Sequence, residues 1–240
     1  MIPWILLDTA EVPGDGGELR LLQRGAEFSI RLGRNELMNS RIHGSEEALA
    51  KIACARIGAR ARPRILIGGL GMGFTLRAAL GVLGAEARVV VAELVPAVVA
   101  WNRGPLAGVS DYSLADARVS IRQADVASLI RSERSAYDAI LLDVDNGPEA
   151  LTRQGNDRLY DLAGLRAAQA ALCPGGVLAV WSAGPDRNFT RRLRKVGFEV
   201  DEVRVRARAT RGGAHHLVWI AGRSARAAKS RAWSGSSPKW

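Results

Sequence analysis

Between residues 64 and 222 the sequence alternates short apolar runs with segments of helical pattern. This alternation constrains the fold more than any other feature. The apolar runs span 64–69, 88–93, 118–125, 137–143 and 177–182, and the helical segments span 74–84, 96–103, 159–172 and 188–197. Apolar runs of this kind predict strands buried on both faces, with helices covering a parallel sheet. We therefore predict an α/β fold with a doubly wound, mostly parallel seven-stranded sheet.

The last two predicted strands, 198–207 and 215–222, follow one another without an intervening helix. A parallel neighbour needs a crossover connection, so one strand of this pair must run antiparallel to the rest of the sheet.

The N-terminal part differs in pattern from the rest of the chain. Residues 18–32 contain two apolar stretches joined by Arg24-Gly25, which is typical of a β-hairpin. Residues 45–58 read as a helix with Ser45 as its N-cap. We expect a small N-terminal β element over 1–44, a nucleotide-binding catalytic domain over 45–222 and a basic disordered tail over 223–240.

The first apolar stretch, MIPWILLDT, lacks the basic flank of a signal peptide and is interpreted as an edge strand. No apolar run approaches the roughly 20 residues of a membrane span, so no membrane association is expected. Cys54 and Cys173 match no metal-binding spacing, and we predict two buried free thiols in a cytoplasmic protein.

The formal net charge of +10 raises the question of nucleic-acid binding. Much of the excess lies in two places. Residues 223–240 hold five basic residues and no acid, and the predicted helix 188–197 carries a basic face. No basic motif is interleaved with aromatic residues, so binding of nucleic acid is possible but solvated charge is favoured. His215 and His216 are interpreted as strand residues near the rim of the sheet, and no metal site is expected.

A glycine-rich loop follows the first strand of the alternating region and opens a helix. Gly69, Gly71 and Gly73 allow a tight turn and close approach of a ligand to backbone N–H groups at the helix start. A tight strand–helix turn without a ligand is the structural alternative. Glu93 ends the second strand, 20 residues after Gly73. An acid at about this spacing typically accepts the ribose hydroxyls of an adenosine.

Further acids follow the third and fourth strands. Asp125 is placed to accept a hydrogen bond from an adenine amino group, to cap the next helix, or to do both. Asp143 and Asp145 come directly after a buried strand, where ligands of parallel sheets bind. A carboxylate there can hold a substrate amine or act as a general base, although a turn built on Asx hydrogen bonds is the alternative.

Taken together, these segments resemble the spermidine and spermine synthases. The resemblance runs from about residue 36 to 222 and rests on the glycine loop, VVVAELVPAVV, DARVSIRQAD, YDAILLDVDNGP, Leu159-Tyr160 and LCPGGVLAVWS. It implies a class I methyltransferase-like sheet behind a small N-terminal β-domain. It also implies that decarboxylated S-adenosylmethionine (SAM) donates an aminopropyl group to a polyamine amine, and that the protein forms a homodimer.

The resemblance also implies roles for individual residues. Gly69, Gly71, Gly73, Glu93, Asp125 and Asp143 would bind the cofactor, with Glu93 holding the ribose and Asp125 the adenine. Asp143, with Asp145, would also position and deprotonate the attacking amine. Glu47 and Tyr160 would contact the substrate.

Three positions depart from the family pattern. Met72 replaces an acid that binds the aminopropyl amine, Asn146 replaces the second acid after the fourth strand, and Ser45 replaces a tyrosine. Two alternatives therefore stay open: a SAM-dependent methyltransferase with an unknown acceptor, and a non-catalytic nucleotide-binding or RNA-associated protein. A nicotinamide-dependent dehydrogenase is disfavoured, because the glycines do not follow the G-x-G-x-x-G spacing.

Overall fold

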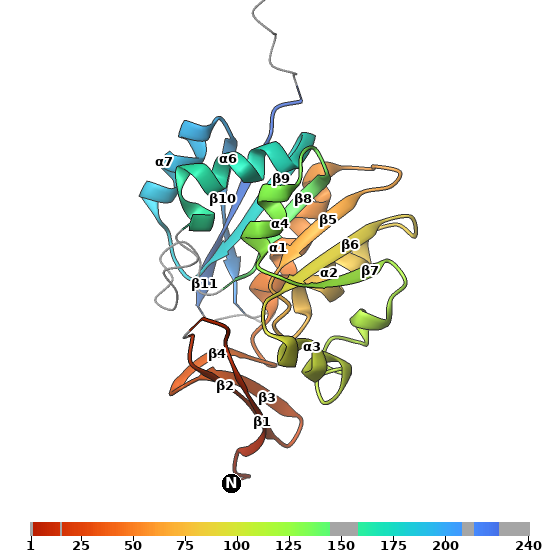
Figure 1. Cartoon of the computed structure of the whole chain (residues 1–240), viewed down its shortest axis with the longest axis vertical. Coiled ribbons are helices and arrows are strands. Elements are labelled where there is room, and N and C mark those ends of the chain that lie inside the picture. Colours follow the sequence, from red (N-terminus) through yellow and green to blue (C-terminus); the bar gives the residue numbers. More distant parts are fainter. Residues whose placement is uncertain (1, 15, 145–157, 208–213, 226–240) are drawn as a thin grey trace, which may run out of the picture.

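The chain forms two β-sheets, a small one at the N-terminus and a large one flanked by helices (Figure 1). The structure is a computed structural model and describes residues 2–14, 16–144, 158–207 and 214–225. The tail predicted to be disordered lies almost wholly outside the described residues.

The large sheet has seven strands in the order β10-β11-β9-β8-β5-β6-β7. The strands are β5 (Arg64–Gly68), β6 (Arg88–Glu93), β7 (Val119–Gln123), β8 (Tyr137–Leu142), β9 (Leu172–Ser182), β10 (Glu199–Arg206) and β11 (His215–Gly222). Strands β5 to β9 pair in parallel, whereas β11 runs antiparallel to both β9 and β10. This arrangement confirms the predicted doubly wound, mostly parallel sheet and its antiparallel strand.

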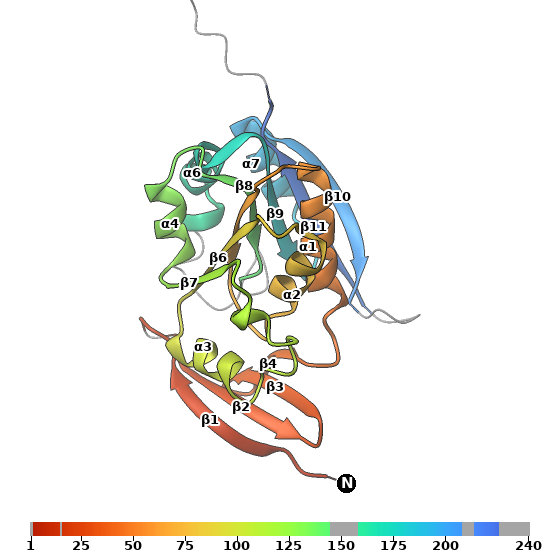
Figure 2. The ribbon, with the colours of Figure 1, turned by 90° about the vertical axis from the view of Figure 1, so that its right-hand side faces the viewer.

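Helices cover both faces of the large sheet (Figure 2). One face carries α1 (Gly44–Ile57), α2 (Phe74–Val82) and α3 (Pro96–Arg103); the other carries α4 (Val126–Ser132), α6 (Leu162–Ala171) and α7 (Arg187–Val196). Successive strand side chains point to opposite faces, so Ile65 and Ile67 pack in one core cluster and Leu66 in the other. Burying one such side chain stabilises the fold by about 1.5–3 kcal/mol.

The N-terminal element is larger than the predicted hairpin. Four antiparallel strands form a sheet of their own: β1 (Ile5–Glu11), β2 (Glu18–Arg24), β3 (Glu27–Leu32) and β4 (Asn35–Asn39). The predicted hairpin is β2–β3, and β1 is at the edge of the sheet, as interpreted from its sequence. Register shifts interrupt the pairing of β1 and of β4, which weakens the alternating pattern that identifies a strand.

Two local predictions need correction. Helix α1 begins at Gly44 with His43 as its N-cap, so Ser45 lies inside the helix and is fully buried. Cys54 is a buried free thiol, and its burial raises the thiol pKa to about 11, but Cys173 is only half-buried. Within the described residues, no helix combines the length and apolar character that crossing a membrane requires.

Candidate active site

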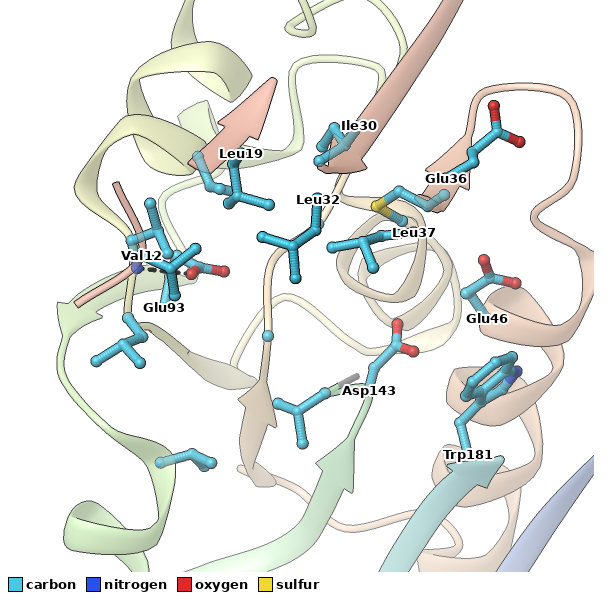
Figure 3. A pocket seen from close by; sticks show the side chains of 18 of the residues that line it. Val12, Leu19, Ile30, Leu32, Glu36, Leu37, Glu46, Glu93, Asp143 and Trp181 are labelled. Atoms are coloured by element: carbon cyan, nitrogen blue, oxygen red, sulfur yellow. Dashed lines mark hydrogen bonds between the residues drawn. The ribbon is translucent and has the colours of Figure 1, made fainter. Parts of the chain in front are cut away.

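A cavity of about 670 Å³ lies at the carboxyl ends of the parallel strands, between the large sheet and the N-terminal sheet (Figure 3). This is the edge at which open parallel sheets bind ligands, and the volume is within the usual range for small-molecule sites. Its apolar walls come from strands of both sheets and from the connections next to them, and include Val12, Leu19, Ile30, Leu32, Leu37, Met38, Val95 and Trp181. Among the described residues, the carboxyl groups that line it are those of Glu36, Glu46, Glu93, Asp125 and Asp143.

The glycine loop forms one side of the cavity and packs directly against the end of β8. Gly69 has a φ of +86°, and a Cβ atom added there would lie 2.4 Å from the backbone oxygen of Asp143. Gly71 lines the cavity, and its carbonyl accepts a 2.7 Å hydrogen bond from Asn102 Nδ2. Gly73 is the left-handed N-cap residue of α2. Glycine is therefore required at Gly69 for close approach to the Asp143 backbone. The sequence predicted a tight turn and the approach of a ligand, and Gly69 and Gly71, but not Gly73, line the cavity where a ligand would bind.

Glu93 is held in place by backbone amides on either side of it. Its Oε2 accepts a 2.9 Å hydrogen bond from Leu70 N, and its Oε1 accepts a 2.8 Å bond from Val95 N. The residue is buried and lines the cavity at the end of β6. The two bonds connect the glycine loop to the start of α3 and fix the position of the Glu93 carboxylate in the cavity wall.

Asp125 is the N-cap of α4 and also lines the cavity. Its carboxylate accepts hydrogen bonds from Ala127 N at 3.1 Å and from Ser128 N at 3.2 Å. Arg131 Nη2 lies 3.5 Å from Asp125 Oδ2. The capping alternative for Asp125 is thus confirmed, and its place in the cavity keeps the adenine-binding role open.

Asp143 follows β8 directly and projects into the cavity (Figure 3). Its Oδ2 accepts a 2.5 Å hydrogen bond from the hydroxyl of Thr75 on α2. Loss of solvent around the carboxyl raises its pKa to about 6, and the Thr75 bond opposes that rise. A carboxyl with such a pKa can exchange protons near neutral pH.

Glu46, on α1, lines the cavity although the sequence interpretation did not identify it, and the same is true of Glu36. Glu46 is 9% exposed and lines the cavity on the same side as Asp143, whereas Glu93 lies on the opposite side (Figure 3). Burial and the nearby Asp143 charge raise its pKa to about 7. The hydroxyl of Ser45 donates a 2.6 Å hydrogen bond to Glu46 Oε2, and His216 Nδ1 lies 2.9 Å from Ser45 Oγ.

The two residues expected to contact the substrate lie away from the cavity. Glu47 points elsewhere on α1, where Arg77 bonds to it at 2.7 Å and Lys51 at 2.9 Å. Tyr160 is buried against Phe189, with 5.6 Å between ring centroids. Neither residue is part of the cavity lining, so a substrate role for them is not supported by this geometry.

The three positions that differ from the family pattern, Met72, Asn146 and Ser45, lie in different surroundings. Met72 is fully buried in the core and does not line the cavity, so the loop offers no side-chain acid at this position. Asp145, predicted to act with Asp143, and Asn146 both lie outside the described residues. Ser45 is present in the site, but as a hydrogen-bond partner of Glu46.

Comparison with known proteins gives matches to solved structures. No family model matches the chain, and no curated protein is similar to it in sequence. A spermidine synthase from Thermotoga maritima superposes with a TM-score of 0.70 at 18% identity, over 92% of this chain and 74% of that one. A spermidine synthase in complex with the transition-state analogue AdoDATO superposes with a TM-score of 0.70 at 18% identity, over 92% of this chain and 73% of that one.

A methyltransferase also superposes on the chain. The 1,6-didemethyltoxoflavin-N1-methyltransferase of Burkholderia thailandensis gives a TM-score of 0.54 at 21% identity, over 76% of this chain and 79% of that one. The protein therefore has the class I methyltransferase-like fold. The spermidine synthases match over a larger share of this chain, and the predicted resemblance to them is confirmed at the level of the fold.

Proposed function

We propose that the protein is a spermidine synthase-like transferase. In this proposal it binds decarboxylated SAM and moves the aminopropyl group to an amine of a polyamine. The observation that carries the proposal is the position of Asp143, at the end of β8 and in one cavity with the glycine loop and Glu93. This position supports the proposal, because ligands of open parallel sheets bind at the carboxyl ends of the strands.

The part of the proposed site that would bind the nucleotide consists of residues whose positions are fixed by contacts with the backbone. Glu93 would accept the ribose hydroxyls, Asp125 would face the adenine, and Gly69 and Gly71 would let the backbone approach the ligand. The solved neighbours support a ligand of this type, because one contains AdoDATO and another S-adenosylhomocysteine.

The amine half must present a neutral nitrogen in line with the bond to be broken. Asp143 would hold the acceptor amine in this orientation. The nitrogen lone pair forms the new C–N bond, the C–S bond breaks, and its electron pair goes to sulfur. The sulfonium thereby becomes the neutral thioether of methylthioadenosine, and the positive charge moves to nitrogen. The apolar walls exclude water and strengthen the attraction between the carboxylates and the cationic nitrogen.

Methyl transfer from SAM is the second candidate. It is favoured by Met72, because a loop without an acid does not repel the carboxylate that ordinary SAM carries and the decarboxylated form lacks. The two candidates differ in the nucleotide bound and in the group transferred.

Calorimetry with SAM, decarboxylated SAM and methylthioadenosine, followed by transfer assays with putrescine and spermidine, tests the proposal. We expect decarboxylated SAM to bind and its aminopropyl group to be transferred. Tight SAM binding without aminopropyl transfer would favour the methyltransferase, and binding of none of the three would exclude both enzymes.

The variant Asp143→Asn tests the residue that carries the proposal. We expect a loss of transfer of at least 100-fold with nearly unchanged methylthioadenosine affinity, because the carboxyl faces the amine and not the nucleoside. The matched control is Asp201→Asn on β10, where the carboxyl is exposed and its Oδ2 lies 3.4 Å from Arg56 Nη2. Unchanged turnover of Asp143→Asn would remove Asp143 from the mechanism.

The remaining assignments are a small-molecule amine substrate, a homodimer and a cytoplasmic location. The homodimer follows from the spermidine synthase resemblance, and sedimentation velocity would test it. The cytoplasmic location is supported by the two free thiols, Cys54 and Cys173.

A further inference from the structure

Glu46 is a carboxyl of the cavity, close to Asp143, that the proposed function has not used. Glu46 and Asp143 come from different elements, α1 and the end of β8, and both project into the cavity on one side (Figure 3). Thr75 connects their surroundings, because its hydroxyl bonds to Asp143 Oδ2 at 2.5 Å and lies 3.4 Å from the backbone oxygen of Glu46.

Among the described residues, neither Glu46 nor Asp143 forms an ion pair with a basic side chain. Glu47 on α1 adds a further negative charge near Glu46, and Arg77 of α2 and Lys51 of α1 both bond to that residue instead. His216 on β11 also lines the cavity and contacts Ser45, and its burial lowers the imidazole pKa, which keeps the ring neutral near pH 7. The pair is therefore suited to receive a cation from the ligand.

Two cations meet in the proposed reaction, the sulfonium and the ammonium form of the acceptor. The ammonium must lose one proton before it can attack. After transfer, the nitrogen again carries a positive charge. One carboxylate is needed to take the proton, and a second must stay ionised to face the nitrogen as its charge develops. A single aspartate cannot do both at once.

The hydrogen bonds around the pair separate these two roles. Asp143 Oδ2 accepts the short bond from Thr75, which favours the ionised form. Glu46 is linked by hydrogen bonds to His216: the Ser45 hydroxyl donates to Glu46 at 2.6 Å, and His216 Nδ1 contacts Ser45 Oγ at 2.9 Å. Because the single hydroxyl hydrogen of Ser45 points to ionised Glu46, His216 donates to Ser45 in that state. When Glu46 is protonated, both bonds can reverse: Glu46 donates to Ser45, and Ser45 donates to His216.

We propose that Glu46 takes up the proton of the acceptor amine, while the Asp143 carboxylate stays ionised and faces the nitrogen during transfer. This inference rests on the proposed function and divides the work expected of Asp143 between two residues. In the first step an N–H bond of the ammonium breaks and an O–H bond forms on Glu46. In the second step the neutral amine forms the C–N bond as the C–S bond breaks. Ser45 and His216 position the Glu46 carboxyl and link it to the rim of the cavity.

Transfer by Glu46→Gln, measured from pH 6 to pH 9.5, tests the proton uptake. At pH 7 we expect kcat/KM to fall by at least 10-fold, with unchanged methylthioadenosine affinity. The deficit should shrink as the pH rises, because more acceptor arrives already neutral. Glu86→Gln is the control: this exposed carboxyl is not among the residues that line the cavity, and the variant should match the wild type at every pH.

A deficit of Glu46→Gln that is the same at all pH values would indicate a structural role and overturn the proposal. Full activity of Glu46→Gln at pH 7 would overturn it as well. If the wild type itself transfers no group, the proposed function has failed, and this inference fails with it.

Carboxyl NMR titration tests the pair without any turnover. In Asp143→Asn, the Glu46 carboxyl should titrate at lower pH than in the wild type, because a neighbouring negative charge has been removed. In Ser45→Ala it should titrate at higher pH, because a hydrogen bond to the ionised form has been lost. An unchanged Glu46 midpoint in Asp143→Asn would show that the carboxyls do not interact and would overturn the proposed division of roles.

Discussion

At the scale of single residues, neighbouring acids on α1 have opposite environments. Glu46 is buried in the cavity wall, and its pKa is raised by burial and by Asp143 to about 7. Burial also acts on Glu47 in the direction of a higher pKa, but hydrogen bonds from Lys51 and Arg77 outweigh it and lower the pKa of that carboxyl. The two shifts have opposite consequences for stability as a function of pH.

Glu46→Gln should stabilise the protein at high pH relative to the wild type. A raised folded-state pKa means that the folded protein binds the proton more tightly, so the wild type loses stability as the pH rises from 4.5 to about 7. Glutamine does not titrate and avoids this loss. We expect the free energy of unfolding of the variant to gain on the order of 2 kcal/mol between pH 5 and pH 8 relative to wild type. Urea unfolding at several pH values measures it.

Glu47→Gln provides the comparison with the opposite sign. Its lowered pKa contributes stability that is present above the ordinary glutamate value of 4.5 and is lost as the pH falls through the folded-state pKa. This variant should therefore be less stable than the wild type at pH 7, and the difference should fade towards pH 3. If the stability difference from the wild type changed with pH in the same direction for Glu46→Gln and Glu47→Gln, the opposite pKa shifts of Glu46 and Glu47 would be contradicted.

At the scale of elements, the glycine loop and the end of β8 form one unit. Asp143 N donates to the Gly68 carbonyl at 3.0 Å, and no room remains for a side chain between Gly69 and the Asp143 backbone. The loop that would bind the nucleotide therefore also determines where the Asp143 carboxyl points. This contact couples the two halves of the proposed site.

Gly69→Ala should disrupt both halves together. The added Cβ would lie 2.4 Å from a backbone oxygen, and the φ of +86° disfavours any side chain. We expect a loss of several kcal/mol in the free energy of unfolding and at least a 10-fold loss of methylthioadenosine affinity.

Gly81→Ala is the matched control for this substitution. Gly81 lies in α2, and apart from its chain neighbours and the backbone of its own helix no atom lies within 4 Å of the position of an added Cβ. Alanine is the better helix former, so the variant should gain about 0.5–1 kcal/mol. Thermal melts and calorimetry measure both variants, and equal behaviour of the two would contradict the packing argument.

At the scale of the whole molecule, the N-terminal sheet completes the cavity. Leu19, Ile30 and Leu32 reach the cavity from this sheet, and Val12 reaches it from the connection between β1 and β2 (Figure 3). One hydrogen bond joins its edge strand to the large domain: Trp101 Nε1 on α3 donates to Asp8 Oδ2 on β1 at 2.7 Å.

Asp8→Ala should weaken that connection. Trp101 is 2% exposed, and loss of its acceptor leaves an indole N–H with poor access to water. We expect a destabilisation of about 1–2 kcal/mol and a measurable loss of nucleotide affinity, because the sheet forms part of the cavity wall. Asp201→Ala, an exposed residue of β10, should change neither quantity. Unchanged stability of Asp8→Ala would show that apolar packing alone holds the sheet in place.

Much of the site was predictable because its signals are local. An apolar run that ends in glycine or an acid identifies a strand end, and the strand ends of a parallel sheet lie at one edge. Gly69, Glu93, Asp125 and Asp143 were therefore expected to face one cavity, and they do. Glu46 also had a local signal: it lies four residues before Ala50 and seven before Ala53, on the buried face of α1.

Tertiary structure alone decided which acid of α1 faces Asp143, that Met72 points into the core, and that four N-terminal strands close the cavity. These outcomes depend on contacts between residues far apart in the chain, such as Asp143 with Glu46 and Trp101 with Asp8. The sequence by itself determined the order of strands and helices and the residues at the strand ends, because hydrophobic periodicity and glycine geometry act within a few residues. The proximity of Glu46 to Asp143 and the closure of the cavity by the N-terminal sheet depend on tertiary packing, which no short stretch of sequence encodes.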